Sequence, residues 1–243
     1  MIESVNNEKI KELIKLKDKK YIKEKGKFLI EGKHLIEEAY KNGYLEEVYV
    51  LDGETSKYPN AIFVSKAVMN KISSLDTSTN MVGVSKVIDK GTIKGNVLVL
   101  DDISDPGNMG TIIRSVVAFN IDTLILSPKC VYLYNSKVIR ATEGMIYNLN
   151  IIVEELNEIL PKLKELGYKI YGTNVIEGTN LKDTVFTSKN AIIIGSEAAG
   201  INKDLYKHID ENIHINISDS CESLNAGVAT SIILYELSNK KSI

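Results

Sequence analysis

The sequence predicts an α/β protein of two domains: a small α/β domain over residues 1–92 and a parallel-sheet domain over residues 93–243. Two observations support this prediction. From Asn96 onward, short apolar segments alternate with helical patterns, which is typical of a parallel sheet covered by helices on both faces. Just before them, the polar segment Lys90–Gly95 contains two glycines, a composition typical of an interdomain linker.

The N-terminal part is expected to form a compact module of three helices and four strands. Its first helix, over residues 8–25, is rich in Lys and Glu and repeats apolar residues such as Ile10, Leu13 and Ile14 at helical spacing. Strands are expected over residues 28–32, 46–51, 61–65 and 81–88, and further helices over residues 34–42 and 64–75.

The C-terminal part follows a regular rhythm of strands and helices. Strands are expected over residues 96–103, 123–127, 150–153, 169–174, 191–197 and 212–217, and helices over residues 109–120, 136–143, 155–166, 203–208 and 223–238. Ligands of parallel sheets bind at the carboxyl ends of the strands. Those ends carry four loops rich in Gly and Asn, so we expect the ligand site at DISDPGNMG, GTNVIEGTN, GSEAAG and ISDSCESLN.

Several classes of protein do not fit the composition. No apolar run approaches the ~20 residues of a membrane span, and the polar N-terminus does not resemble a signal peptide, so a cytoplasmic protein without a membrane partner is expected. The two cysteines have no metal-ligand spacing, and no metal is expected. The dinucleotide-binding glycine pattern, the P-loop and the G-x-S-x-G elbow are all missing from the sequence.

The charge distribution leaves two interpretations open. The net charge is −2, yet residues 1–43 hold 11 Lys against seven Glu and one Asp. These lysines either form a solvated helix face paired with Glu, or contact RNA phosphates through residues such as Lys17, Lys19 and Lys20. Only Arg114 and Arg140 are arginine among 30 basic residues. A guanidinium binds phosphate or carboxylate in a bidentate manner, so both positions are candidate phosphate contacts.

Three segments carry the most specific signal: DPGNMGTIIR (residues 105–114), IGSEAAGI (194–201) and ESLNAGVA (222–229). Their order and their places after predicted strands resemble the three motifs of the SpoU/TrmH family of RNA ribose 2′-O-methyltransferases, in the SPOUT class. The resemblance covers roughly residues 94–238. Residues 5–90, with KGKFLIEGKHLIEEA, are similar to the substrate-binding module that commonly precedes this family's catalytic domain.

The resemblance implies a SPOUT domain with a C-terminal trefoil knot, a homodimer in which the partner completes the site, and an RNA substrate, with 23S-type rRNA favoured over tRNA. It also implies S-adenosylmethionine as methyl donor. The residues expected to bind the donor lie in the last three loops: Thr173, Asn174, Gly195, Ser196, Gly200, Ile215, Ile217, Leu224 and Asn225.

The residues expected to act in catalysis are Asn108, Arg114, Glu197, Ser223 and Asn225. A protonated Arg114 cannot serve as a base, so the resemblance implies that it pairs with the phosphate beside the target ribose and helps to deprotonate the hydroxyl. Asn108 is expected to orient Arg114 or the ribose, or else to cap a helix. Glu197 is expected to hydrogen-bond neighbouring loops.

Ser223 and Asn225 are expected at the start of the last helix, where they orient the hydroxyl or Arg114, or serve as caps. Arg140, in KVIRATEG, matches a further position of the family pattern and is expected to contact RNA phosphate or the catalytic loop, or otherwise to support the structure.

Two segments depart from the family pattern. Ile217–Cys221 reads ISDSC and lacks the usual proline, and Ala198 replaces the first glycine after Glu197. Both lie in loops expected to bind the donor. An alternative function is therefore an RNA-binding or ribosome-assembly protein with weakened donor binding. The shared retention of the candidate catalytic residues favours the enzyme.

Overall fold

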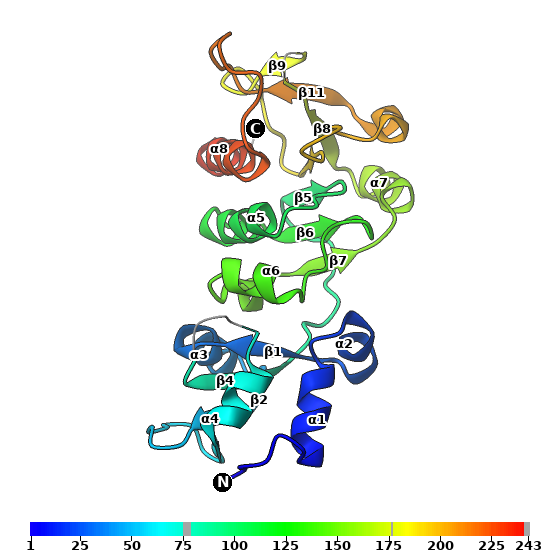
Figure 1. Ribbon diagram of the computed structural model, residues 1–243. Helices are drawn as coiled ribbons and strands as arrows, with labels where there is room; N and C mark the ends of the chain where they lie inside the picture. Colours follow the sequence, from blue (N-terminus) through cyan, green and yellow to red (C-terminus); the bar gives the residue numbers. More distant parts are fainter. Residues whose placement is uncertain (75–78, 176, 241–243) are drawn as a thin grey trace. The chain divides into compact units, whose positions relative to one another are not determined.

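The computed structural model describes residues 1–74, 79–175 and 177–240. The chain divides into two compact units (Figure 1). The first comprises residues 1–88 and 132–147, and the second comprises residues 89–131 and 148–243. Leu75, at the expected end of a helix, and Ile176, within one expected loop, lie outside the described residues.

The first unit contains a four-stranded sheet in the order β1-β4-β2-β3. β1 (Lys27–Glu31) and β2 (Leu45–Leu51) both pair antiparallel with β4 (Met81–Lys86), and β3 (Ile62–Val64) pairs parallel with β2. Its helices are α1 (Glu8–Lys15), α2 (Lys19–Lys25), α3 (Lys33–Lys41) and α4 (Lys66–Ile72). One core cluster joins α1 and α4 to the sheet through residues such as Ile10, Met69 and Val82.

The expected single helix over residues 8–25 is wrong, because the chain breaks into α1 and α2. Leu16, Lys17 and Asp18 each donate a backbone hydrogen bond to the carbonyl three residues earlier, which tightens and ends α1. The Asp18 side chain then accepts from the Lys20 N–H over 2.7 Å and caps α2. Because Lys and Glu residues continue across the break between α1 and α2, the sequence pattern gives no sign that the helix ends there.

Residues 132–147 pack with the first unit, although the prediction assigned all of residues 93–243 to one domain. This segment contains α6 (Ser136–Ala141) and the 3₁₀ helix η1 (Met145–Asn148). Tyr134 packs on Phe28 with ring centroids 4.7 Å apart, and the Tyr147 hydroxyl hydrogen-bonds the Ser85 hydroxyl over 2.9 Å. Such contacts between distant segments leave no local sequence signal.

The second unit is built on a seven-stranded parallel sheet, in the order β7-β6-β5-β10-β8-β11-β9. This confirms the predicted parallel sheet. The strands are β5 (Val97–Leu100), β6 (Thr123–Leu126), β7 (Ile151–Val153), β8 (Lys169–Thr173), β9 (Thr179–Asn180), β10 (Asn190–Ile194) and β11 (Glu211–His214). The trefoil knot implied by the family resemblance stays a prediction.

Helices cover both faces of this sheet, with α5 (Pro106–Ala118) and α8 (Ala226–Asn239) on one face and α7 (Leu156–Glu165) on the other (Figure 1). Val97, Val99 and Ile193 share a buried cluster with α7 and with η2 (Lys203–His208), a 3₁₀ helix. Because side chains alternate along a strand, Leu98 and Leu100 point to the opposite face.

α5 and α8 pack closely along their length, because small residues face each other. The Gly227 α-carbon lies against Thr111, and the Ser115 and Ser231 hydroxyls are 2.7 Å apart. One turn further along each helix, Phe119 packs edge-on against Tyr235. This pairing fixes the start of α8 against the start of α5, where two of the three sequence motifs lie.

The expected linker is attached to the second unit. Gly91 N–H donates to the Ile151 carbonyl, and the Asn150 side chain bonds the backbone of Thr92 in both directions. Lys90 forms an ion pair with Glu154. Residues 90–92 thus extend along the edge strand β7, whose backbone groups would otherwise lack partners.

Candidate functional site

Three side chains from the three motifs form one hydrogen-bonded network. The buried Asn108, in the first turn of α5, donates from Nδ2 to Glu197 Oε1 over 2.7 Å. Asn225, immediately before α8, donates from Nδ2 to Asn108 Oδ1 over 2.8 Å. The segments after β5 and β10 and the start of α8 are thereby joined at the carboxyl edge of the sheet, as the predicted loops require.

The ends of both helices account for the positions of these amides. Asp105 is the N-cap of α5, where its carboxylate accepts from the Asn108 N–H over 2.7 Å. Asn108 is therefore not the cap, and its side chain is free to bridge Glu197 and Asn225. Asn225 is the N-cap of α8, whose first residue is Ala226, and Ser223 precedes the helix. Asn225 therefore caps the helix, as one expected role required, and also belongs to the network; its expected role in orienting the hydroxyl or Arg114 stays a prediction.

The Glu197 carboxylate is held in its charged form. Burial raises the pKa of Glu197, but hydrogen bonds from the Asn108 amide and from backbone N–H groups, including that of Ser104, outweigh burial. Its pKa therefore lies below the ordinary value of a glutamate. A carboxylate that stays ionised and accepts hydrogen bonds orients the Asn108 amide and is poorly suited to donate a proton.

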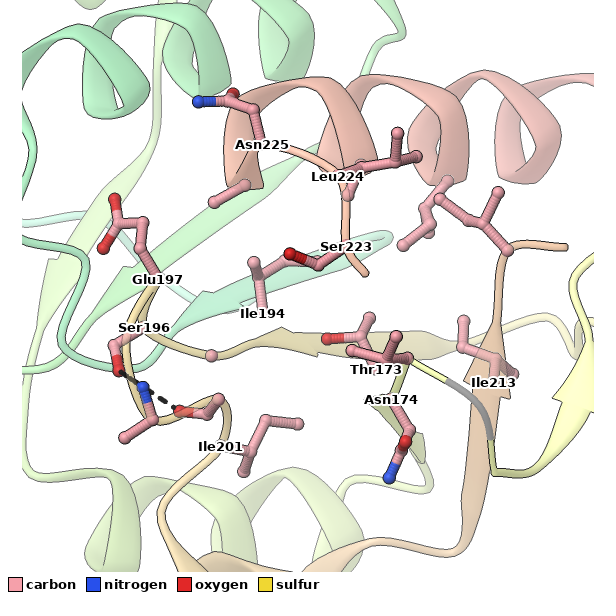
Figure 2. A pocket seen from close by; sticks show the side chains of 18 of the residues that line it. Thr173, Asn174, Ile194, Ser196, Glu197, Ile201, Ile213, Ser223, Leu224 and Asn225 are labelled. Atoms are coloured by element: carbon pink, nitrogen blue, oxygen red, sulfur yellow. Dashed lines mark hydrogen bonds between the residues drawn. The ribbon is translucent and has the colours of Figure 1, made fainter. Parts of the chain in front are cut away.

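A cavity of about 620 Å³ opens beside this network. Figure 2 shows Glu197 and Asn225 toward one side of the pocket, and Asn174 and Ile213 toward the opposite side. Every residue expected to bind the donor lines this cavity, and Glu197 and Ser223 do so as well. Asn108 contacts two of the lining residues, and Arg114 is not among the lining residues.

The loop after β10 brings backbone close to backbone. A β-carbon on Gly195 would lie 2.1 Å from the Gly200 carbonyl carbon, so any larger residue would force the loop open. Ser196 and Gly200 exchange two backbone hydrogen bonds, of 3.0 and 2.9 Å. Ala198 takes the place of the family's glycine without disturbing this closed turn.

The segment that departs from the family pattern forms its own turn. The Cys221 N–H donates to the Ser218 carbonyl over 2.9 Å, and the Ser218 and Ser220 hydroxyls are 2.8 Å apart. Ile217 before this turn and Ser223 after it both line the cavity. The loop without proline therefore still brings both of its ends to the pocket.

Neither of the two arginines is engaged by another side chain of the described residues. Arg114 is exposed on α5, six residues after Asn108, and Arg140 is partly exposed on α6 in the first unit. Within the described part of the chain, neither guanidinium has a hydrogen bond or an ion pair, whereas the cations of the ion pairs are lysines. An unpaired guanidinium remains available to an anionic ligand.

The three candidate RNA-binding lysines differ in their surroundings. Lys17 donates to the Ser73 and Lys71 carbonyls, and burial lowers its pKa. Its ammonium thus closes the end of α4, which favours a structural role over the expected phosphate contact. The Lys19 ammonium lies 4.9 Å from the centre of the Tyr132 ring. Lys20 is exposed, and its ammonium has no partner within the described ranges.

Comparison with known proteins decides the family. The SpoU rRNA methylase family matches residues 95–235, and the MRM3-like substrate binding domain matches residues 7–83. The 23S rRNA (guanosine(2553)-2′-O)-methyltransferase RlmP of Bacillus subtilis is 31% identical over 97% of this chain and 98% of its own length. This chain belongs to the SpoU rRNA methylase family. Its membership confirms the predicted resemblance and, with it, the prediction of an RNA methyltransferase.

Solved structures of SpoU and TrmH proteins share the fold over nearly the whole chain. A TrmH-family chain from Porphyromonas gingivalis has a TM-score of 0.85 at 26% identity and covers 96% of this chain and 98% of its own. The SpoU methyltransferase AviRb from Streptomyces viridochromogenes, in complex with AdoMet, also has a TM-score of 0.85, at 22% identity over 96% of this chain and 97% of its own. This second likeness concerns the fold.

The sequence did not reveal several apolar residues of the SpoU pocket. Tyr206 on η2 lines it, as do Ile201, Ile213 and Ile233. The three isoleucines are buried, so from the sequence they cannot be told apart from ordinary core residues. Tyr206 also carried no signal in the sequence, since its 39% exposure on the wall of the pocket is visible only in the structure.

In the described ranges, no group of three or more His, Cys, Asp or Glu side chains is placed to hold a metal ion. None of the helices formed by those residues is long and apolar enough to cross a bilayer.

Proposed function

We propose that this SpoU protein transfers a methyl group from S-adenosylmethionine to a ribose 2′-hydroxyl of 23S-type rRNA. The observation that carries the proposal is the cavity beside the Asn108–Glu197–Asn225 network, in a chain of this family. The match with RlmP over nearly the full length of both chains supports 23S rRNA as the substrate class.

The cavity fits the methyl donor. The closed backbone around Gly195 and Gly200 forms one wall that a nucleoside can approach closely. Isoleucines form an apolar surface for the base of that nucleoside. Thr173, Asn174, Ser196 and Leu224, with Ile215 and Ile217, are the further residues proposed to hold it. When bound, S-adenosylmethionine supplies an electrophilic methyl group on its sulfonium.

The chain's own residues must place and activate the ribose hydroxyl. Arg114 acts by pairing with the phosphate beside the target ribose, which positions the hydroxyl and assists loss of its proton. Ser223 and Asn225 both line the cavity, with Asn225 toward the side that also holds Glu197 (Figure 2), and both orient the hydroxyl. Asn108 and Glu197 fix the orientation of the Asn225 amide.

The first unit, matched by a substrate-binding domain, holds the RNA. Lys19, Lys20 and Arg140 are the proposed phosphate contacts, because a cation without a carboxylate partner gains most from a phosphate. Lys17 contributes by holding the end of α4.

A homodimer is proposed through the exposed face of α5 and α8, which we call the α5/α8 face and define by Thr111, Arg114, Ala118, Val228 and Tyr235. Val228 is 46% exposed and Tyr235 is 55% exposed, an apolar surface that a second copy would cover. Because Arg114 belongs to this face, the dimer would place it beside the partner's α5/α8 face. A cytoplasmic location accords with an rRNA substrate.

The proposal is tested by methyl transfer in vitro. Purified protein, labelled S-adenosylmethionine and rRNA from cells lacking the protein are incubated, and 2′-O-methylated nucleotides are mapped. We expect one new 2′-O-methylated ribose in the large-subunit rRNA. Labelling of a base, or of tRNA alone, would contradict the proposed acceptor. An absence of transfer to naked rRNA and to ribosomal subunits would contradict the proposed activity.

A further inference from the structure

Tyr206 lines the cavity outside the network of Asn108, Glu197 and Asn225. Tyr206 is the single aromatic side chain among the described residues that line the cavity, and it remains 39% exposed. The other apolar lining side chains are aliphatic, and Ile201 and Ile213 are buried. An aromatic ring on the wall of a pocket offers a flat apolar surface to a planar group of a ligand.

The ring is carried by a well-anchored element. η2 begins after Asn202, whose N–H donates to the carboxylate of the buried Asp101 over 2.6 Å. Within η2, Leu205 is buried in the cluster beneath the sheet. The backbone that carries Tyr206 is therefore anchored by the residues just before it, so little backbone freedom is lost when a ligand packs on this wall.

The chemistry of the cavity indicates which part of the donor meets this ring. The methyl group must reach the ribose hydroxyl at the polar side, where Glu197 and Asn225 lie (Figure 2). Ile201, two residues before η2, lies on the side away from Asn225 (Figure 2). The adenosine of the donor consequently extends toward the apolar side, and its flat part is the adenine base.

We propose that Tyr206 stacks on the adenine ring of the methyl donor and is a donor-binding residue of this enzyme. This inference rests on the proposed function, since it assumes that the cavity binds S-adenosylmethionine. The stacking requires an aromatic ring and does not require the tyrosine hydroxyl.

The first test compares donor binding by Tyr206→Ala and Tyr206→Phe. We expect Tyr206→Ala to weaken S-adenosylmethionine and 5′-methylthioadenosine about tenfold or more, and Tyr206→Phe to bind both within about twofold of wild type. In turnover, Tyr206→Ala should raise the KM for the donor while kcat at saturating donor and the KM for RNA stay unchanged. Tyr40→Ala, at a 51% exposed tyrosine of the first unit, is the matched control.

The second test exploits the absence of tryptophan from the chain. Tyr206→Trp places a single indole in the cavity, and 5′-methylthioadenosine should quench its fluorescence with the affinity measured by calorimetry. Tyr40→Trp should not respond. Unchanged indole emission in a variant that binds the donor would contradict stacking.

The outcomes separate this inference from the function on which it rests. If wild type binds the donor and Tyr206→Ala binds equally well, the stacking role is wrong and the proposed function stands. If Tyr206→Phe is impaired as much as Tyr206→Ala, the hydroxyl rather than the ring acts, which also overturns the inference. If wild type binds neither probe, the proposed function itself fails.

Discussion

The side-chain amide of Asn108 donates a hydrogen bond to the Glu197 carboxylate across 2.7 Å, although the two residues are 89 positions apart in the chain. The same amide group accepts from Asn225, so its orientation is fixed from both sides. The Glu197 carboxylate can only accept hydrogen bonds, so the Asn108 amide must donate to it from Nδ2 and accept from Asn225 through Oδ1. The direction of each hydrogen bond in the network is therefore fixed. This relationship explains why the three motifs occur together.

Asn108→Ala and Asn225→Ala should show energetic coupling. Each removes a partner of the other, so the loss of unfolding free energy in the double variant should be smaller than the sum of the single losses by about 1 kcal/mol. Urea unfolding of the four proteins measures this coupling. As a control, Asn108→Ala is combined with Lys203→Ala, at an exposed lysine on η2 outside the network. The losses of unfolding free energy in this control pair should be additive. Additive losses in the first pair would contradict a shared network.

Glu197 should contribute to stability in a pH-dependent manner. Its pKa in the folded protein is lowered, so its contribution is present above the ordinary glutamate range, near pH ~4.3, and is lost as the pH falls through the lowered value. Glu197→Gln keeps an acceptor for Asn108 but does not titrate. The advantage of wild type over Glu197→Gln in urea unfolding should therefore narrow below pH ~4. A difference that is constant from neutral to acidic pH would show that the charge is not stabilised.

Gly195→Ala and Gly200→Ala should differ, although both lie in one loop. The added β-carbon at position 195 meets the Gly200 backbone, so we expect a loss of about 2–3 kcal/mol in unfolding free energy together with loss of donor binding. At Gly200 the space is open but φ is +68°, and the strain should cost only about 1 kcal/mol. Calorimetry and urea unfolding distinguish the two. If the two variants lost equal amounts of unfolding free energy and bound the donor equally well, the loop would open readily to admit the added β-carbon at position 195.

The two arginines should separate catalysis from RNA binding. Arg114→Ala should lower the transfer rate at saturating RNA by about 10²-fold or more, and Arg114→Lys should recover little, because lysine lacks the bidentate fork. Donor affinity and the far-ultraviolet circular dichroism should be unchanged. Arg140→Ala should instead raise the KM for RNA and leave kcat near that of wild type. Unchanged turnover in Arg114→Ala would contradict its catalytic role without affecting the family assignment.

Most of the second unit could be predicted from sequence because its strands are short apolar runs with no polar face. Val97–Leu100 and Ala191–Ile194 are buried throughout, and such runs between helical patterns predict a parallel sheet. The position of the candidate pocket could be predicted as well, because the ligand-binding loops of a parallel sheet lie at the carboxyl ends of its strands. β9, with two residues, is too short to leave a pattern.

The remaining differences arise from interactions that local patterns do not contain. Residues 132–147 join the first unit through contacts such as Tyr134 with Phe28. Lys17 satisfies carbonyls at the end of α4, more than 50 residues away, while its sequence neighbours suggest only a charged face. Tyr206 reaches the pocket because η2 is anchored to Asp101, at the end of a strand about 100 residues earlier.

The proposed function depends on binding of S-adenosylmethionine in the cavity at the carboxyl edge of the sheet. Calorimetric titration of the purified, folded protein with this donor measures that binding. We expect one site per chain with micromolar affinity, weakened by Gly195→Ala and preserved in Arg114→Ala. If no binding is measurable, either with the protein alone or in the presence of rRNA, the proposed function is wrong. The protein would then be an RNA-binding protein in which the loop with the turn at Ser218–Cys221 no longer holds the donor.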